Sequence, residues 1–299
     1  MERISFHDQI SRNKRKSFFL VLIVFATLIL LGYVIGLIYQ DMFFFILIIA
    51  IIFSTVYTIT GYYNSDKIAL ASVSAKPATH AQYPRYYNLV EGLCLASGMP
   101  KPRLYVMPGQ SINAFASGRS PEHSVICVTE GALKKLNKQE LEGVLGHELS
   151  HIANYDIRFM TLTAVLVGMI AIISQIFLRS LWWRSLSGGR DRNQGQAIFI
   201  LIGIILAVLA PIVVMLVQLA ISRKREYTAD ASSVKFIRSP TGLIHALRKI
   251  DSEHPTEEKK KISKAIAPLF ISDPFKKKIQ TLTSTHPPIK KRIEVLERM

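Results

Sequence analysis

The stretch NKQELEGVLGHELSHIAN, residues 137–154, has the pattern of one amphipathic helix. Asn137 is a favourable N-cap, and Glu140 stands at the third helical position, as in a capping box. Further apolar residues recur at helical spacing up to position 152. His147 and His151 are four residues apart, so both imidazoles share one helix face and can bind one metal ion, with Glu148 beside them as a base. The sequence therefore predicts a metal site on this helix.

A catalytic zinc site usually takes three protein ligands, so a third must come from elsewhere in the chain. The metzincin spacing of the third ligand is excluded, because it would need glycine and histidine where the chain has Asn154 and Ile157. The thermolysin spacing is excluded as well, because its third ligand, a glutamate, would fall within an apolar segment that contains no acidic residue. Asp156 follows the second histidine too closely to turn back easily, so we expect no ligand role for it. Glu226 remains as the expected third ligand. Asp230, four residues later on the same helix face, is expected to hold a ligand histidine through its second ring nitrogen.

Four segments without a charged residue indicate an integral membrane protein: 17–40, 42–65, 159–178 and 197–221. Hydrophobic residues make up 49% of the chain and charged ones 19%, against about 25% charged residues in ordinary soluble domains. Each segment can cross a hydrocarbon core of about 30 Å. We expect two membrane hairpins, and the second has to return to the side it left, because the metal ligands flank it. Since arginines crowd its tip, a partly inserted second hairpin remains an alternative.

The net charge of +16 raises the question of nucleic-acid binding. The lysine runs 259–261 and 276–278, however, lack interleaved aromatic residues, and no nucleic-acid-binding motif accompanies them. We therefore expect no nucleic-acid partner and interpret these runs as a solvated or lipid-facing basic surface. The basic N-terminus and the nearly uncharged tip of the first hairpin place the N-terminus and the active site in the cytoplasm. Two cysteines, Cys94 and Cys127, exclude a disulfide-based scaffold.

These observations divide the chain into five parts: a basic cytoplasmic N-terminus (1–16), a first transmembrane hairpin (17–65), the first half of the domain outside the membrane, with the histidine helix (66–158), a second transmembrane hairpin (159–221), and the second half of that domain, with the third ligand (222–299). Within 66–158, strands are expected at 103–107, 112–117 and 124–129, since these stretches are apolar and bounded by turn residues.

The order of these motifs resembles the HtpX-type membrane zinc metalloproteases, which are related to the CAAX prenyl endopeptidases. The resemblance rests on the basic N-terminus, the first hairpin, the stretch SINAFA at 111–116, the HELSH motif at 147–151, the stretch REYTAD at 225–230, and the stretch THPP at 285–288. It implies a mainly α-helical integral membrane protein with four hydrophobic helices and a zincin-like α+β metalloprotease domain containing a small β-sheet. It also implies a bacterial inner-membrane endopeptidase, linked to heat and other stress, that removes misfolded or damaged membrane proteins.

By the same resemblance, one Zn²⁺ per chain is bound by His147, His151 and Glu226, with Glu148 as general base. Asp230 and Arg292 support the ligands from behind, and Asn113 and His286 lie in the catalytic cleft. Expected partners are unfolded or membrane-protein polypeptides, the lipid bilayer, and other membrane quality-control proteases. Two alternatives stay open: a CAAX-type prenyl-protein endopeptidase, and a non-catalytic membrane scaffold with a structural metal.

Overall fold

The structure is a computed structural model that describes residues 6–38, 40–164, 205, 223–253, 269–271 and 287–299. Over these residues the chain is mostly helical, with one small mixed sheet. Beyond residue 164, the expected second hairpin lies outside the described residues, residue 205 excepted. The expectation of four membrane helices is therefore not confirmed.

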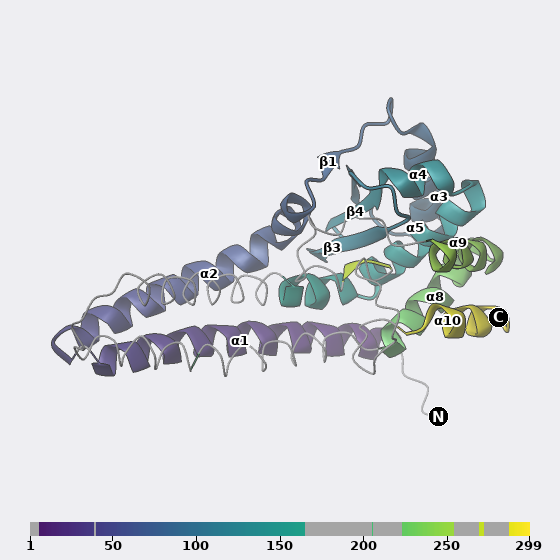
Figure 1. The fold of residues 1–299 in the computed structure, drawn as a ribbon. Coiled ribbons are helices and arrows are strands. Elements are labelled where there is room, and N and C mark those ends of the chain that lie inside the picture. The colour runs from purple at the N-terminus through teal and green to yellow at the C-terminus, as the bar shows by residue number, and fades with distance from the viewer. Residues whose placement is uncertain (1–5, 39, 165–204, 206–222, 254–268, 272–286) are drawn as a thin grey trace.

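The first hairpin consists of two long antiparallel helices that project from the rest of the molecule (Figure 1). Helix α1 spans Phe6–Ile38, the short 3-10 helix η1 spans Gln40–Met42, and α2 spans Phe43–Ser72. The helices approach so closely that a Cβ added at Gly32 would overlap the side chain of Ala50. Many large apolar side chains of both helices are exposed, among them Phe18 at 65% and Phe44 at 76%. Within the described part of the chain, α2 is the one helix that is long and apolar enough to cross a membrane.

The sheet has the strand order β1-β2-β4-β3, with β1 spanning Lys76–Pro77, β2 Arg103–Met107, β3 Ala114–Ser120 and β4 His123–Thr129. Strands β2 and β4 are parallel, and the other pairs are antiparallel. Strand β2 has the expected bounds, and β3 and β4 differ from them by a few residues. This arrangement leaves β3 at one edge of the sheet.

Alternate side chains of β4 enter two different cores, as the two-residue period of a strand requires. Ile126 and Val128 pack with α3 (Pro84–Ser97) and α5 (Lys138–Ala153), whereas Val125 and Cys127 pack with the C-terminal end of α2. The sheet is thus buried on both faces, and the second core joins it to the membrane hairpin.

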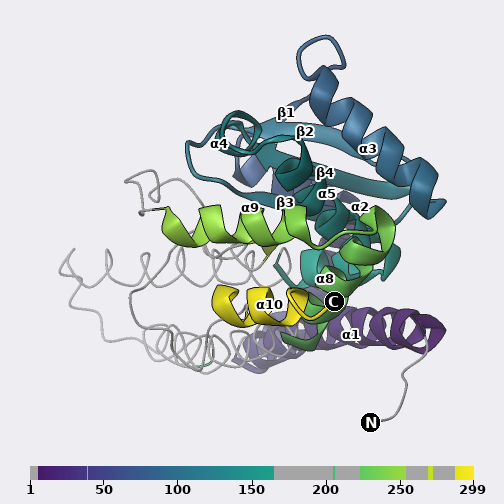
Figure 2. The same cartoon turned by 90° about the vertical axis from the view of Figure 1, so that its right-hand side faces the viewer.

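The described part of the chain also contains α4 (Glu130–Lys135), helical residues 156–164, α8 (Arg223–Ile237), α9 (Thr241–Ser252) and α10 (Ile289–Leu296). Helices α8 and α9 pack on α5, and α10 packs against α8 and α9 (Figure 2). Helix α5 begins with the expected capping box, because the Asn137 side chain accepts a hydrogen bond from the Glu140 N–H at 2.9 Å and the Glu140 carboxylate accepts one from the Asn137 N–H at 2.8 Å. The described part of α8 starts at Arg223, and the expected fourth apolar segment before it lies outside the described residues.

Candidate active site

Helices α5 and α8 pack closely at Gly146, where side chains of α8 occupy the space that a side chain on α5 would need. A Cβ added at Gly146 would lie 2.7 Å from the Ser233 hydroxyl oxygen and 2.8 Å from Cδ1 of Ile237. The same hydroxyl donates a hydrogen bond of 3.1 Å to the carbonyl oxygen of Gly143. This crossing fixes α8 on α5 and brings the first turn of α8 over the histidines of α5.

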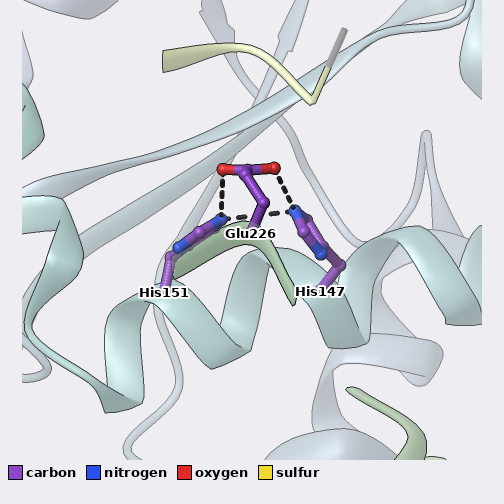
Figure 3. A group of neighbouring side chains, drawn as sticks. All are labelled: His147, His151 and Glu226. Carbon is purple, nitrogen blue, oxygen red and sulfur yellow. Dashed lines mark hydrogen bonds and ion pairs between the residues drawn. The ribbon is translucent and has the colours of Figure 1, made fainter. Parts of the chain in front are cut away.

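Three buried side chains converge at this crossing: His147, His151 and Glu226 (Figure 3). The two Nε2 atoms are 3.2 Å apart. The Glu226 carboxylate oxygens lie 3.7 Å from Nε2 of His147 and 3.6 Å from Nε2 of His151. All three possible ligand atoms lie within 4.8 Å of one another. The three predicted metal ligands therefore meet at one point.

The outer nitrogen of each histidine contacts a carboxylate. Nδ1 of His147 lies 2.9 Å from Oδ1 of Asp230, and Nδ1 of His151 lies 3.1 Å from Oδ2 of Asp156. A carboxylate is an acceptor, so each Nδ1 carries the proton and each Nε2 presents a lone pair toward Glu226. Two imidazole lone pairs and a carboxylate are the ligand types that Zn²⁺ takes in catalytic sites. The residues present therefore fit a zinc ion.

The charges around this point also favour a cation. Near the metal ligands, the buried groups of the described residues include four carboxylates (Glu148, Asp156, Glu226 and Asp230) and two guanidinium groups (Arg225 and Arg292). When all six are ionised and both histidines are neutral, four negative and two positive charges leave a formal charge of −2. A buried net charge is costly unless an ion or a proton compensates it. A divalent cation supplies that compensation.

Glu148 lies on the same helix, fully buried between the metal ligands and the sheet. The backbone N–H of Ala116 in β3 faces its carboxylate and favours the charged form, which lowers the pKa. The oxygen Oε1 has no hydrogen-bond partner among the described residues. Burial, together with the nearby charge of Glu226, raises the pKa of Glu148 to about 7. A carboxylate with such a pKa can take and return a proton near neutral pH.

Arg292 in α10 lies directly behind the ligands and is completely buried. Its Nε and Nη2 donate to the two oxygens of Asp230 at 2.8 and 2.6 Å, a bidentate pair. Its Nη1 lies 3.5 Å from Glu226 and donates to the carbonyl oxygen of Ile271 at 3.3 Å. Arg292 thus holds the carboxylate that holds His147. The resemblance had suggested a supporting role for this residue without naming a partner.

Two cleft residues suggested by the resemblance remain less defined. Asn113 is buried at the start of β3, where its side-chain oxygen accepts a hydrogen bond from the N–H of Ala114 at 3.0 Å. It precedes by three residues the backbone N–H that contacts Glu148. His286 lies outside the described residues. The structure therefore assigns neither residue a contact with a substrate.

Asp156 is the residue that the sequence interpretation missed. Helix α5 ends at Ala153, and Tyr155 takes the left-handed conformation with φ of 57°. This turn brings Asp156 back to His151, although they are only five residues apart. The signal available in the sequence was an aspartate soon after the second histidine. A left-handed tyrosine is rare, however, and could not be expected from the residue types.

Comparison with known proteins agrees with this geometry. The pattern of "Peptidase family M48" matches residues 80–299. The proteins named "Protease HtpX homolog" from Caldanaerobacter subterraneus subsp. tengcongensis and Thermoanaerobacter pseudethanolicus are 41% and 42% identical, over 100% of this chain and 99% of their own. The one from Streptococcus gordonii is 40% identical over 98% of this chain and 99% of its own.

Among solved structures, the crystal structure of S. mikatae Ste24p matches with a TM-score of 0.48 at 18% identity, covering 96% of this chain and 66% of that one. Family membership rests on the sequence matches, which extend over most of the chain. The chain therefore belongs to peptidase family M48 and is a metalloprotease, a hydrolase that cleaves peptide bonds.

Proposed function

We propose that this protein is a zinc-dependent endopeptidase of the cytoplasmic membrane that degrades misfolded or damaged membrane proteins. The observation that carries the proposal is the convergence of His147, His151 and Glu226, whose ligand atoms lie within 4.8 Å of one another. Each histidine also has its outer nitrogen against a carboxylate, which fixes the ring orientation that metal binding needs.

In this proposal His147, His151 and Glu226 hold one Zn²⁺. When bound, zinc polarises the scissile carbonyl and makes water a nucleophile near neutral pH. Glu148 accepts a proton from the attacking water at Oε1, the oxygen without a hydrogen-bond partner among the described residues. The N–H of Ala116 faces this carboxylate from β3 and favours its charged form. Glu148 then delivers the proton to the nitrogen of the leaving amine.

The substrate is proposed to bind in an extended conformation along β3, the edge strand of the sheet. A peptide that adds to an edge strand is held by main-chain hydrogen bonds, so the site tolerates many sequences. Residues 269–271 already pair with the beginning of this strand: the N–H of Ile271 donates to the carbonyl oxygen of Ala114 at 2.9 Å, and Phe270 bridges Phe115. A substrate at these positions has to displace that segment.

The proposed topology places the N-terminus and the active site on the cytoplasmic side. Asn13 in the first turns of α1 hydrogen-bonds to the turn that follows α5, so the N-terminal end of α1 and the metal ligands share one side. Lys14, Arg15 and Lys16 make this end basic, and basic flanks stay in the cytoplasm. The exposed apolar side chains of α2, such as Phe44 at 76%, suit contact with lipid.

Casein digestion by the detergent-purified full-length protein tests the proposed activity. We expect cleavage that stops with a chelator and returns when zinc is added back. Glu148→Gln keeps the shape of the side chain but removes the proton acceptor, so cleavage should fall by about a hundredfold or more. Glu142→Gln, a half-buried glutamate on the same helix, is the matched control and should cleave normally. Normal cleavage by Glu148→Gln would refute its role as the base.

A prenylated CAAX peptide separates this proposal from the related prenyl-protein endopeptidase. Our proposal predicts that the protein cleaves unfolded membrane-protein segments without requiring a prenyl group. Strict dependence of cleavage on prenylation would favour the alternative. No metal-dependent cleavage of any of these substrates would favour the scaffold alternative.

A further inference from the structure

The N-terminal end of α1 contacts the residues that orient one metal ligand. The side-chain amide of Asn13 donates two hydrogen bonds, one of 2.7 Å to Oδ1 of Asp156 and one of 3.0 Å to the carbonyl oxygen of Asn154. Asn13 is only 4% exposed although it lies on the helix that leads into the membrane. The other oxygen of Asp156 contacts Nδ1 of His151 at 3.1 Å. A continuous chain of hydrogen bonds thus leads from α1 to a metal ligand.

The turn that carries Asp156 has a conformation that needs support from its surroundings. Tyr155 has φ of 57°, which costs energy for a residue with a side chain and persists only where neighbouring contacts hold it. Helix α1 provides such contacts on both sides of this residue. Lys14 lies 4.4 Å from the centre of the Tyr155 ring, and Asn13 binds the residues before and after it.

Asp156 needs a partner for the oxygen that faces away from His151. Arg225 contributes positive charge there, but its nearest nitrogen is 3.9 Å from Oδ1, which is too far for a hydrogen bond. The Asn13 amide supplies the short, directed contact at 2.7 Å. With both oxygens held, the Asp156 carboxylate has a fixed orientation, and so has the imidazole that binds to it.

We propose that Asn13 is a positioning residue for the metal centre: it fixes Asp156, which orients His151. Helix α1 is then part of the catalytic structure as well as a membrane anchor. A displacement of α1 would weaken metal binding at a site formed by α5 and α8. This inference rests on the proposed metal-binding function.

Zinc affinity is the measurement that distinguishes this role from a purely structural one. We would use the full-length protein in detergent, with Glu148→Gln throughout to prevent self-digestion, and titrate zinc against a competing chelator. Loss of an outer contact to a metal ligand typically weakens metal binding by about 10–100-fold. We expect Asn13→Ala to weaken zinc binding by about tenfold. Asp156→Asn should weaken it by at least as much.

The double variant provides the decisive comparison. If Asn13 acts through Asp156, adding Asn13→Ala to Asp156→Asn should weaken zinc binding no further. Ser17→Ala is the matched control: this buried serine lies one turn along α1 and bonds to the carbonyl oxygen of Asn13, not to Asp156. Its zinc affinity should equal that of the parent. Equal affinity of Asn13→Ala and the parent would overturn the inference, and so would additive losses in the double variant.

The outcomes also separate this inference from the proposed function. If the parent protein binds no zinc, the proposed function fails. If the parent binds zinc and Asn13→Ala binds it equally well, only the role of Asn13 fails. Should Asn13→Ala unfold, Asn13→Leu fills a similar volume without a donor and should show the same tenfold loss. Unfolding of both variants would overturn the inference, because Asn13 would then serve the fold and not the metal centre.

Discussion

Replacing Arg292 with methionine removes the positive charge behind the metal site while keeping an apolar stem of similar length. The side chain is completely buried and makes a bidentate pair with Asp230 at 2.6 and 2.8 Å. Removing one member of a buried ion pair leaves the other charge uncompensated, which costs about 3–5 kcal/mol. At about 2–4 °C per kcal/mol for a domain of this size, the thermal midpoint of the metal-free protein should fall by roughly 10 °C.

Differential scanning calorimetry of the detergent-purified protein, with and without zinc, measures this effect. Bound zinc places positive charge beside the same carboxylates, so the loss should be smaller in the zinc-loaded protein. Arg248→Met is the control: Arg248 pairs with Glu297 at 2.6 Å, but both side chains are about half exposed, at 54% and 46%. Such pairs contribute about 1 kcal/mol or less. Equal midpoints for the two variants, or no influence of zinc, would refute the reasoning.

The same variant has a predicted pH dependence. Burial alone would raise the pKa of Asp230, but the charge of Arg292 and hydrogen bonds from His147 and Arg292 hold it below the usual value. A carboxyl whose pKa is lower in the folded state stabilises the protein above its unfolded-state pKa of about 3.9. That contribution is lost as the pH falls through the folded-state pKa. The difference between wild type and Arg292→Met should therefore shrink in acid.

Three further predictions concern the packing around the site and the membrane topology. Gly146→Ala should destabilise the protein by about 1–3 kcal/mol and weaken zinc binding, because the new Cβ would press on side chains of α8. Gly92→Ala is the control and should be neutral or stabilising, since no atom lies within 4 Å of its new Cβ. Chemical denaturation and zinc titration compare the two variants. Asn137→Ala should cost about 1 kcal/mol through loss of the α5 cap, measured in the same way; an unchanged midpoint would contradict the capping role. Single cysteines at positions Ser187 and Ser272, in a background without native cysteines, report the side of the membrane on which each residue lies. An impermeant thiol reagent added to intact spheroplasts should label only the cysteine at Ser187, at the tip of the second hairpin. Protection of both cysteines would favour a partly inserted second hairpin.

The parts of the site that depend on local patterns were predictable. The cap at Asn137, the helix after it, and the placement of His147 and His151 on one face all follow from spacing within a few residues. Glu226 could be identified over a longer distance because few other acidic residues remained possible. Its place on a helix next to an apolar segment then put Asp230 on the same face.

The parts that depend on tertiary contacts were not predictable. The turn at Tyr155 brings Asp156 to His151, and Asn13 of α1 hydrogen-bonds to the residues on both sides of that tyrosine. Asn13 and Asp156 are 143 residues apart in sequence, and nothing local to either indicates the contact. Helix α1 also begins at Phe6, well before the apolar segment, since charged residues can continue a helix beyond the membrane. Hydropathy therefore predicts where α1 is expected to enter the membrane, but it does not predict the N-terminal end of that helix.

The zinc content of the purified full-length protein, compared with that of Glu226→Ala, tests the central claim most directly. Elemental analysis after removal of loosely bound metal should give one zinc per chain for the wild type. Removing the Glu226 carboxylate leaves two imidazoles, so the variant should retain only a small fraction of that zinc. A wild-type protein without zinc, or a Glu226→Ala variant with full zinc content, would contradict the account.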